Sequence, residues 1–441
     1  MRNGVGYAFG ITRRQAAIGA VAALGSIPTR VVAQSTCNTV PDDPTADRPD
    51  PQTVWRSISD PELALAFRNH GMMAELLRTD ITPLGAHYLL THFSVPPLSA
   101  EGYSIAIGGQ VQNPFRISLS ELQGRGTITQ AVTMECAGTG RRGLQPRPVY
   151  VPWDKEAIGT YQWTGTPLRP LLEQAGLASN AVEVLFTGWD SGVDLGIEHA
   201  FERSMPVADA MRDEVMLAWA ANGQKLLPEH GFPLRLVVPS WYGMASVKWL
   251  RAITVLDEPF EGVQQKQVYI YETVKDGPSQ PVRQKHVNSV MLPIGIPDLM
   301  SRTCFVAPGT QTLQGKAWSG FGAVTGVEVS TDGGSSWMSA QLRPSLSDSF
   351  AWVDWQAQWS AGPGAYTLVC RAWDDAGNVQ PLDPQAAWNL GGNGVNEAQQ
   401  VSVIVQDGIG SALSQVPCQP QLVIPGAELP PAPATRNTLV S

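Results

Sequence analysis

The stretch from Thr127 to Gly143 reads TITQAVTMECAGTGRRG, and the rest of the chain is interpreted from it. Apolar residues alternate with other residues up to Met134, which is the two-residue period of a half-buried strand. The strand is expected to end at Cys136, because the glycines that follow allow the backbone angles of a tight loop. Arg141 and Arg142 come next. Since nearby positive charge lowers the pKa of a thiol, the pattern predicts a thiolate that attacks electrophiles or binds a soft metal.

A lone cysteine is more often a small, inert core residue, and the ECAG tetrapeptide alone does not exclude that interpretation. A second motif, EHGFPLRLVVPSWYGMASVKWL from Glu229 to Leu250, favours the chemical role. Arg235 and Lys248 lie within its apolar runs, and a buried cation needs a counter-charge. The motif therefore predicts either an internal salt bridge to Asp or Glu, or a clamp on a bound anion such as a phosphate.

Composition excludes some classes of protein. The formal net charge of −9, with no basic cluster, argues against a nucleic-acid partner. A length of 441 residues predicts two or three domains, each large enough to bury a core. The cysteines at positions 37, 136, 304, 370 and 418 lack the paired spacings of zinc ribbons and c-type haem sites, so no haem is expected.

The N-terminus is typical of a targeting segment. Arg13-Arg14 precedes a mildly apolar run, and Val31-Val32-Ala33 offers small residues for cleavage. Residues 1–33 are thus predicted to be a Tat-type signal for export to the periplasm, the alternative being a frayed helix with two chance arginines. No later segment is apolar enough to span a bilayer, so no membrane span is expected in the mature protein. In an oxidising compartment Cys37 and Cys418 could pair.

The fold class predicted is α+β, followed by a β-sandwich. Strands and short helices mixed over residues 60–300 indicate antiparallel or mixed sheets, with one helix from Thr164–Pro167 to Gly176. No phosphate-binding glycine motif of a Rossmann fold is present. Over residues 301–408, short alternating segments separated by turns predict an immunoglobulin-like sandwich, in which Cys370 is a core thiol. Residues 34–59 are expected to form an irregular arm, and residues 409–441 a Pro-rich tail.

The motifs ECAGTGRR, WTGTPLRPLLEQAG and HGFPLRLVVPSWYGMASVKWL resemble the molybdenum domain of the sulfite oxidase family, and the resemblance spans residues 60–408. It implies one molybdopterin, whose dithiolene binds molybdenum together with the thiolate of Cys136. It also implies that Arg141 meets the substrate and that the sandwich mediates a homodimer. The cofactor-binding residues that it implies are His92, Asp190, His230, Arg235, Ser246, Val247 and Lys248.

The chain departs from the family pattern at two positions. Leu90-Thr91-His92 stands where family sulfite oxidases carry Arg-Asn-His, so the arginine beside the substrate anion is absent. Alignment through Ser204-Met205-Pro206 places Phe201 where the family has a tyrosine near the metal. These changes predict weak turnover of sulfite and a preference for a larger or less charged sulfur or nitrogen compound.

The sequence as a whole predicts an exported, molybdenum-dependent oxidoreductase that transfers an oxygen atom to or from a small sulfur-containing substrate such as sulfite. With no haem expected in the chain, electrons should pass to a separate carrier such as a c-type cytochrome. The alternatives are a sulfane dehydrogenase-like activity, a reductase of S- or N-oxides, and a cofactor-free binding protein on the same scaffold.

Overall fold

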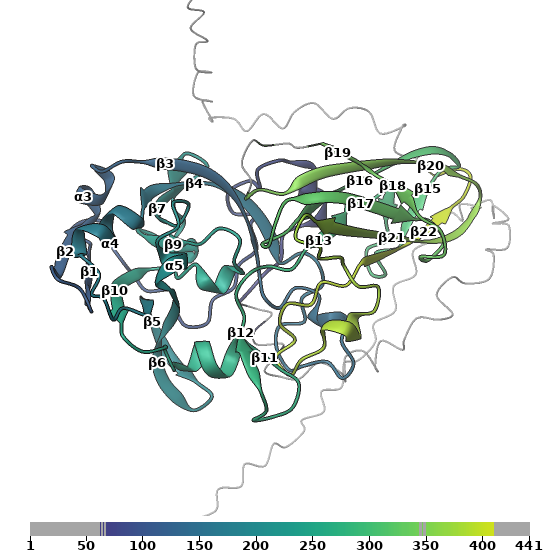
Figure 1. Cartoon of the computed structure of the whole chain (residues 1–441). Helices are drawn as coiled ribbons and strands as arrows, with labels where there is room; N and C mark the ends of the chain where they lie inside the picture. Colours follow the sequence, from purple (N-terminus) through teal and green to yellow (C-terminus); the bar gives the residue numbers. More distant parts are fainter. Residues whose placement is uncertain (1–61, 63–64, 66–67, 344–345, 347–349, 410–441) are drawn as a thin grey trace, which may run out of the picture. The chain divides into compact units, whose positions relative to one another are not determined.

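The computed structural model describes residues 62, 65, 68–343, 346 and 350–409 (Figure 1). The predicted signal peptide and N-terminal arm lie outside the described residues, as does the Pro-rich tail apart from its first residue. Arg13, Arg14, Cys37 and Cys418 are therefore outside them as well. All of the described residues belong to one compact unit.

The first domain contains a mixed sheet and an antiparallel sheet. In the mixed sheet, the order is β2-β1-β10-β5-β6, with β1 parallel to β10 and the other pairs antiparallel. The order of the second sheet is β3-β4-β7-β8, and β9 pairs with β7. The first sheet consists of β1 (Ser104–Gly109), β2 (Phe115–Ser118), β5 (Glu183–Asp194), β6 (Ile197–Pro206) and β10 (Leu250–Leu256). The second consists of β3 (Ile128–Glu135), β4 (Ile158–Pro167), β7 (Met216–Ala221), β8 (Gln224–Lys225) and β9 (Arg235–Val237).

The helices of this domain are short and lie between the strands. Helix α3 (Leu119–Gln123) begins with a capping box in which Ser118 and Glu121 satisfy each other's backbone N–H groups. Helix α4 (Arg169–Ala175) ends at Gly176, whose φ of +68° suits a glycine cap. The predicted start of this helix at Thr164–Pro167 is wrong, because these residues extend β4, where they pair with β7. The remaining helices are α5 (Val207–Ala210), η1 (Ala74–Arg78), η2 (Arg141–Gly143), η3 (Pro228–His230), η4 (Gly243–Ala245) and η5 (Gln264–Val268).

The second domain is the predicted immunoglobulin-like sandwich, and its two sheets enclose one apolar core. Cys370 is a fully buried free thiol in this core. Strand β13 precedes residue 301 in the sequence and yet pairs with β16 of the sandwich. One sheet consists of β13 (Asn288–Met291), β16 (Gly309–Trp318), β20 (Val353–Ala361) and β19 (Gln341–Arg343). The other consists of β14 (Ile296–Pro297), β15 (Cys304–Val306), β22 (Gln399–Val405), β21 (Gly364–Asp374), β17 (Val324–Ser330) and β18 (Met338–Ser339).

Two further elements matter for the site. A small ribbon of β11 (Ile270–Glu272) and β12 (Ser279–Pro281) connects the domains in sequence, and η6 (Pro384–Ala387) precedes a loop that leads into β22. Within the described part of the chain, no helix has the length and apolar character needed to cross a bilayer.

Candidate active site

Cys136 lies directly after β3, at the start of the predicted glycine loop. Its backbone N–H donates to the carbonyl of Ala157 at 2.9 Å, which fixes the end of the strand. The guanidinium of Arg141 folds back over this loop, so a Cβ at Gly138 would lie 2.5 Å from Arg141 Nη1. A side chain at position 138 would displace the guanidinium, so the glycine allows the loop to bring the thiol and the guanidinium together.

The two arginines of the loop have different environments. Arg141 is buried and donates to the carbonyls of Val151 and Gly391, each at 3.0 Å. The side chain of Arg142 is 70% exposed and pairs with Asp154. Of these two arginines, Arg141 is therefore the one whose charge lowers the pKa of the Cys136 thiol.

The predicted lowering of the thiol pKa by two arginines is wrong for the protein without a metal. Burial raises the pKa of Cys136, and the charge of Arg141 offsets only part of that increase. A thiol in this environment becomes a thiolate when a bound soft metal displaces its proton.

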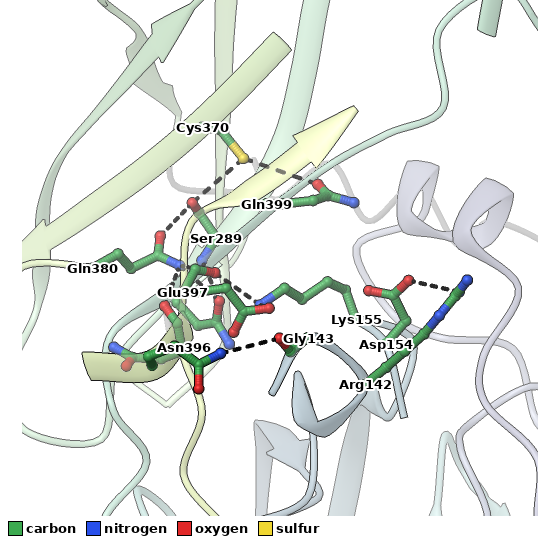
Figure 2. Close-up of polar contacts among 12 residues, drawn as sticks. Arg142, Gly143, Asp154, Lys155, Ser289, Cys370, Gln380, Asn396, Glu397 and Gln399 are labelled. Atoms are coloured by element: carbon green, nitrogen blue, oxygen red, sulfur yellow. Dashed lines mark hydrogen bonds and ion pairs between the residues drawn. The ribbon is translucent and has the colours of Figure 1, made fainter. Parts of the chain in front are cut away.

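Residues of the second domain cover the outer side of the cysteine loop. Glu397 pairs with Lys155 Nζ at 3.1 Å, and both side chains are largely buried (Figure 2). The Glu397 carboxylate is so close to Gly140 that a Cβ there would lie 2.8 Å from Oε2. The N–H of Gly394 donates to the carbonyl of Ala137 at 2.6 Å. The shape of the loop beside Cys136 thus depends on the second domain.

One cavity, of about 260 Å³, opens on one side of Cys136. Among the described residues that line it, Arg141 is the one Arg or Lys and Asp194 the one carboxylate, so their formal charges cancel. Most of the other lining residues are apolar or aromatic. The cavity is lined by Leu65, Leu90, Thr91, His92, Phe93, Cys136, Arg141, Tyr150, Val151, Trp153, Val193, Asp194, Val268, Tyr269, Gly391 and Asn393.

The wall beside His92 combines an apolar ring and a hydroxyl. Phe201 packs against the ring of His92, with 4.4 Å between the centroids, so this part of the wall is apolar. Phe201 brings no hydroxyl to the wall, but Tyr269 supplies one. Its hydroxyl lies 2.5 Å from His92 Nε2, and it comes from the residue after η5 rather than from β6.

A second cavity adjoins the first and shares Leu90, His92, Cys136 and Tyr269 with it. It brings together six of the seven residues expected to bind the cofactor. Val247 is the exception, because its side chain is fully buried in the apolar core and its carbonyl accepts from the N–H of Leu236. The expected cofactor residues that line the cavity are His92, Asp190, His230, Arg235, Ser246 and Lys248, and other lining residues include His87, Tyr88, Met134, Phe201 and Met244.

The two cations of the second motif are held by backbone carbonyls. Arg235 donates to the carbonyls of His230 and Ser246, each at 2.9 Å, and stacks over Trp163. Lys248 Nζ donates to the carbonyls of Leu90 and Glu229, each at 2.9 Å. Within the described ranges, no carboxylate lies at ion-pair distance from either side chain.

These contacts leave the charges of Arg235 and Lys248 without a counter-ion. Burial lowers the pKa of Arg235 to about 10 and that of Lys248 to about 7. Since a buried cation is costly without an anion, the cavity favours a ligand that carries negative charge. Of the two alternatives drawn from the sequence, the arrangement agrees with an anion clamp.

Two unsatisfied polar atoms test whether a pterin cofactor fits this cavity. Asp190 Oδ1 and His87 Nε2 are buried and have no hydrogen-bond partner among the described residues. Burial raises the pKa of Asp190 to about 7 and lowers that of His87 to about 4. Because a buried polar group without a partner is costly, a ligand rich in N–H and ring-nitrogen groups satisfies both.

The metal chemistry fits as well. The described residues contain no cluster of three or more His, Cys, Asp or Glu side chains able to hold a metal ion. The soft thiolate of Cys136 suits a metal that the dithiolene of a cofactor also binds.

Comparisons with known proteins agree with this site. Residues 92–264 match the family model described as oxidoreductase molybdopterin binding domain, and residues 283–406 match the Mo-co oxidoreductase dimerisation domain. The chain is 34% identical to the mitochondrial sulfite oxidase of Homo sapiens over 347 residues, which cover 74% of this chain and 62% of that protein. It is 33% identical to the sulfite oxidase of Gallus gallus, with 72% of each chain covered.

A solved structure is similar over a larger part of the chain. The sulfane dehydrogenase SoxCD from Paracoccus pantotrophus matches with a TM-score of 0.63 and 25% identity, covering 84% of this chain and 96% of that one. The fold and the site define a molybdopterin-dependent oxidoreductase. The chain belongs to the sulfite oxidase family. It spans 62% of the length of the human and mouse sulfite oxidases that it matches.

Four residues that matter for the site were not found from the sequence. His87, Asp194 and Tyr269 line the cavities, and Asn393 lines the 260 Å³ cavity from the second domain. His87 precedes the extended segment that holds His92, so a second histidine there was an available signal. Tyr269 and Asn393 carry no local signal, because their role depends on contacts with residues more than a hundred positions away.

Proposed function

We propose that this protein oxidises an organic sulfur oxyanion that carries at most one negative charge and an apolar substituent, such as a sulfinate. The reaction is R–SO₂⁻ + H₂O → R–SO₃⁻ + 2 H⁺ + 2 e⁻, in which water supplies the oxygen atom. When bound, the molybdenum cofactor supplies the oxygen-transfer chemistry and accepts the electron pair. We propose a separate carrier, such as a c-type cytochrome, as the electron acceptor.

The observation that carries this proposal is the composition of the 260 Å³ cavity beside Cys136. One guanidinium is opposed by one carboxylate there, so the cavity is poorly suited to a dianion. Its volume far exceeds what a single water needs and leaves room for a substituent. The aromatic and aliphatic wall stabilises an apolar group by burying it.

The proposal gives each residue of the site a role. Cys136 is the protein ligand of the metal, and Arg141 binds the oxyanion through N–H groups that its backbone partners do not use. Tyr269 and His92 offer a neutral hydrogen-bonding pair to the same substrate. On the cofactor side, the positive charges of Arg235 and Lys248 compensate the negative charge of the pterin's phosphate. Asp190, His230, Ser246 and, through its backbone alone, Val247 complete the pterin site.

The test compares substrates on purified protein loaded with molybdenum. We expect kcat/KM for an alkyl or aryl sulfinate to exceed that for sulfite. The same screen includes thiosulfate as a sulfane compound, because the chain resembles a sulfane dehydrogenase, and includes sulfoxide reduction as the reverse direction. A preference for sulfite, thiosulfate or sulfoxide over every sulfinate tested contradicts the proposal.

A single substitution tests the charge argument. Leu90 lines both cavities, so Leu90→Arg places a second cation where they meet. A charge-assisted hydrogen bond of about 2 kcal/mol corresponds to roughly a thirtyfold gain in kcat/KM toward sulfite. Leu65→Met, at another lining position, serves as an uncharged control. An unchanged ratio of sulfite to sulfinate activity in Leu90→Arg shows that the cavity does not select by charge.

We further propose export by a Tat-type signal and assembly as a homodimer through the second domain. The matched dimerisation model supports the dimer. Replacement of Arg13 and Arg14 by Lys is expected to retain the protein in the cytoplasm, since the pathway recognises the twin arginine. Normal periplasmic levels of this variant contradict the proposed signal. The amount of molybdenum per monomer tests the alternative of a cofactor-free binding protein. Purified protein without molybdenum would support that alternative.

A further inference from the structure

Asn393 reaches the substrate cavity from the second domain and connects two separate parts of the first. It lies in the loop between η6 and β22, and it is 2% exposed. Its side-chain Nδ2 donates to the carbonyl of Val268 at 3.2 Å and to that of Ile270 at 3.3 Å. Its Oδ1 accepts from Arg141 Nη2 at 3.4 Å. One amide thus joins the guanidinium of the cavity to the carbonyls of the two residues on either side of Tyr269.

The orientation of this amide follows from its partners. A guanidinium only donates hydrogen bonds and a carbonyl only accepts them, so the oxygen must face Arg141 and the nitrogen must face the Tyr269 segment. Both ends of the amide are used, and no other arrangement satisfies all three partners. An aliphatic residue of the same size satisfies none of them, and a carboxylate satisfies only Arg141.

The loop that carries Asn393 is itself held in place. Asn389 accepts from the N–H of Asn393 at 3.0 Å and donates to its carbonyl at 2.7 Å. The carbonyl of Gly391 accepts from Arg141 Nε. Gly392 has a φ of +57°, and a Cβ there would lie 2.7 Å from Arg141 Cγ. The loop is therefore shaped to pack against Arg141, and Asn393 has little freedom to move.

We propose that Asn393 is a positioning residue that fixes the spacing between Arg141 and the Tyr269 hydroxyl, and so sets how the substrate oxyanion is bound. This inference rests on the proposed function, in which both groups bind the same substrate. Without the amide, Arg141 loses one of its acceptors and the Tyr269 segment loses two donors. Both binding groups then move among several positions. Part of the binding free energy of the anion is used to order them, so the anion binds more weakly.

The neutral amide has a second consequence for charge. It holds Arg141 without neutralising it, so the guanidinium keeps its positive charge for the substrate. A carboxylate at position 393 would accept from Arg141 more strongly, but it would compete with a bound anion and repel the two carbonyls. The chemistry of the residue, and not only its size, therefore determines anion affinity.

The experiment compares Asn393→Ala and Asn393→Asp with Asn396→Ala. Asn396 is a matched control, because it lies in the same segment, is 8% exposed and donates through Nδ2 to the carbonyl of Val287 at 2.9 Å. It does not line the cavity. For each purified, molybdenum-loaded variant, the measurements are Tm, molybdenum per monomer, the Kd for methanesulfonate by calorimetry, and kcat and KM for a sulfinate. Methanesulfonate is the probe because, like the proposed substrate, it carries one negative charge and an apolar group.

We expect all three variants to lose thermal stability and to retain molybdenum. Asn396→Ala should keep the methanesulfonate Kd and the sulfinate KM within about twofold of the wild type. Asn393→Ala should raise the methanesulfonate Kd and the sulfinate KM by roughly tenfold, as expected for the loss of one hydrogen-bond contact to a charged group. Asn393→Asp should raise the methanesulfonate Kd further than Asn393→Ala does, although it restores an acceptor for Arg141.

The proposal is overturned if Asn393→Ala binds methanesulfonate as Asn396→Ala does, or if Asn393→Asp binds it as well as the wild type. If Asn393→Ala does not fold, Asn393→Ser provides the same comparison with Asn396→Ala. Methanesulfonate binding also separates this inference from the proposed function. A wild type that binds methanesulfonate but oxidises no sulfinate contradicts the proposed function only, whereas a wild type that binds no methanesulfonate contradicts both.

Discussion

The hydroxyl of Tyr269 lies 2.5 Å from His92 Nε2, although 177 residues separate the two in the sequence. Burial, with the nearby charge of Lys248, lowers the pKa of His92 to about 3, so the ring is neutral near pH 7. Burial raises the pKa of Tyr269, so the phenol keeps its proton. The pair is an uncharged hydrogen-bonding unit at the junction of the two cavities. Arg141 is thus left as the group that carries positive charge on the substrate side.

Removing the Tyr269 hydroxyl should lower activity without unfolding the protein. In Tyr269→Phe, the His92 ring loses its partner and the substrate loses a donor, so kcat/KM is expected to fall by up to about tenfold. Steady-state kinetics with a sulfinate measures this effect. Tyr271→Phe is the matched control, because the Tyr271 hydroxyl is buried, has no hydrogen-bond partner in the described part of the chain and does not line either cavity. Equal losses in the two variants would assign the effect to packing.

The two adjacent arginines should give different results. Arg141→Gln removes the cation of the substrate cavity, and we expect the KM for an anionic substrate to rise by roughly tenfold to a hundredfold. Arg142→Gln removes an exposed cation whose partner is Asp154, so KM should stay near the wild-type value. Kinetics on both variants at equal molybdenum content checks this. A larger effect from Arg142→Gln would place the substrate outside the cavity.

The thiol of Cys136 should be essential, and the other buried thiols should not be. Cys136→Ser is expected to retain the fold but to lose turnover by more than about a hundredfold, since even a residue that supports a metal ligand contributes ten- to a hundredfold. The thiolate-to-metal absorption band should disappear with the activity. Cys304→Ser, at a buried free thiol of the second domain, is the control and should remain active. Full activity in Cys136→Ser would exclude a thiolate ligand.

Acid should destabilise the cofactor-free protein through His87. Burial lowers the pKa of this histidine from 6.5 to about 4 in the folded state. Between these values the unfolded chain binds the proton and the folded chain does not, so the free energy of unfolding falls as pH falls from 6.5 to 4. The loss at pH 4 is about 3 kcal/mol by this linkage. Above pH 6.5 the residue contributes nothing to the pH dependence.

Thermal unfolding of His87→Gln across this pH range measures the effect. The Tm of the variant should fall less steeply than that of the wild type below pH 6.5. His70→Gln, at an exposed position, is the control for the loss of a histidine as such. Identical slopes for His87→Gln and the wild type would show that His87 is not neutral in the folded protein.

The sequence by itself determined the features that depend on neighbouring residues. The strand from Ile128, the tight loop after Cys136 and the glycine cap at Gly176 follow from alternation and from backbone angles that only glycine adopts freely. The sandwich follows from repeated short strands separated by turns. The long motifs around Cys136 and Lys248 carry the resemblance to the sulfite oxidase family, and that resemblance predicted the cofactor class.

Only the tertiary structure decided which side chains meet. Arg141 and Arg142 are neighbours in the sequence, yet one is buried against the thiol loop and the other is exposed, because the backbone turns between them. Desolvation, which no sequence pattern reports, raises the pKa of Cys136 despite the nearby guanidinium.

The substrate side was the least predictable part for the same reason. Tyr269 and Asn393 come from segments far from Cys136 in the chain, and long-range packing brings them to one cavity. Their side chains belong to an irregular connection and a loop, where local propensity carries little information. One motif, Glu229–Leu250, holds five of the expected cofactor residues, so the sequence could group them, whereas folding decided the lining of the 260 Å³ cavity because its residues come from separate segments.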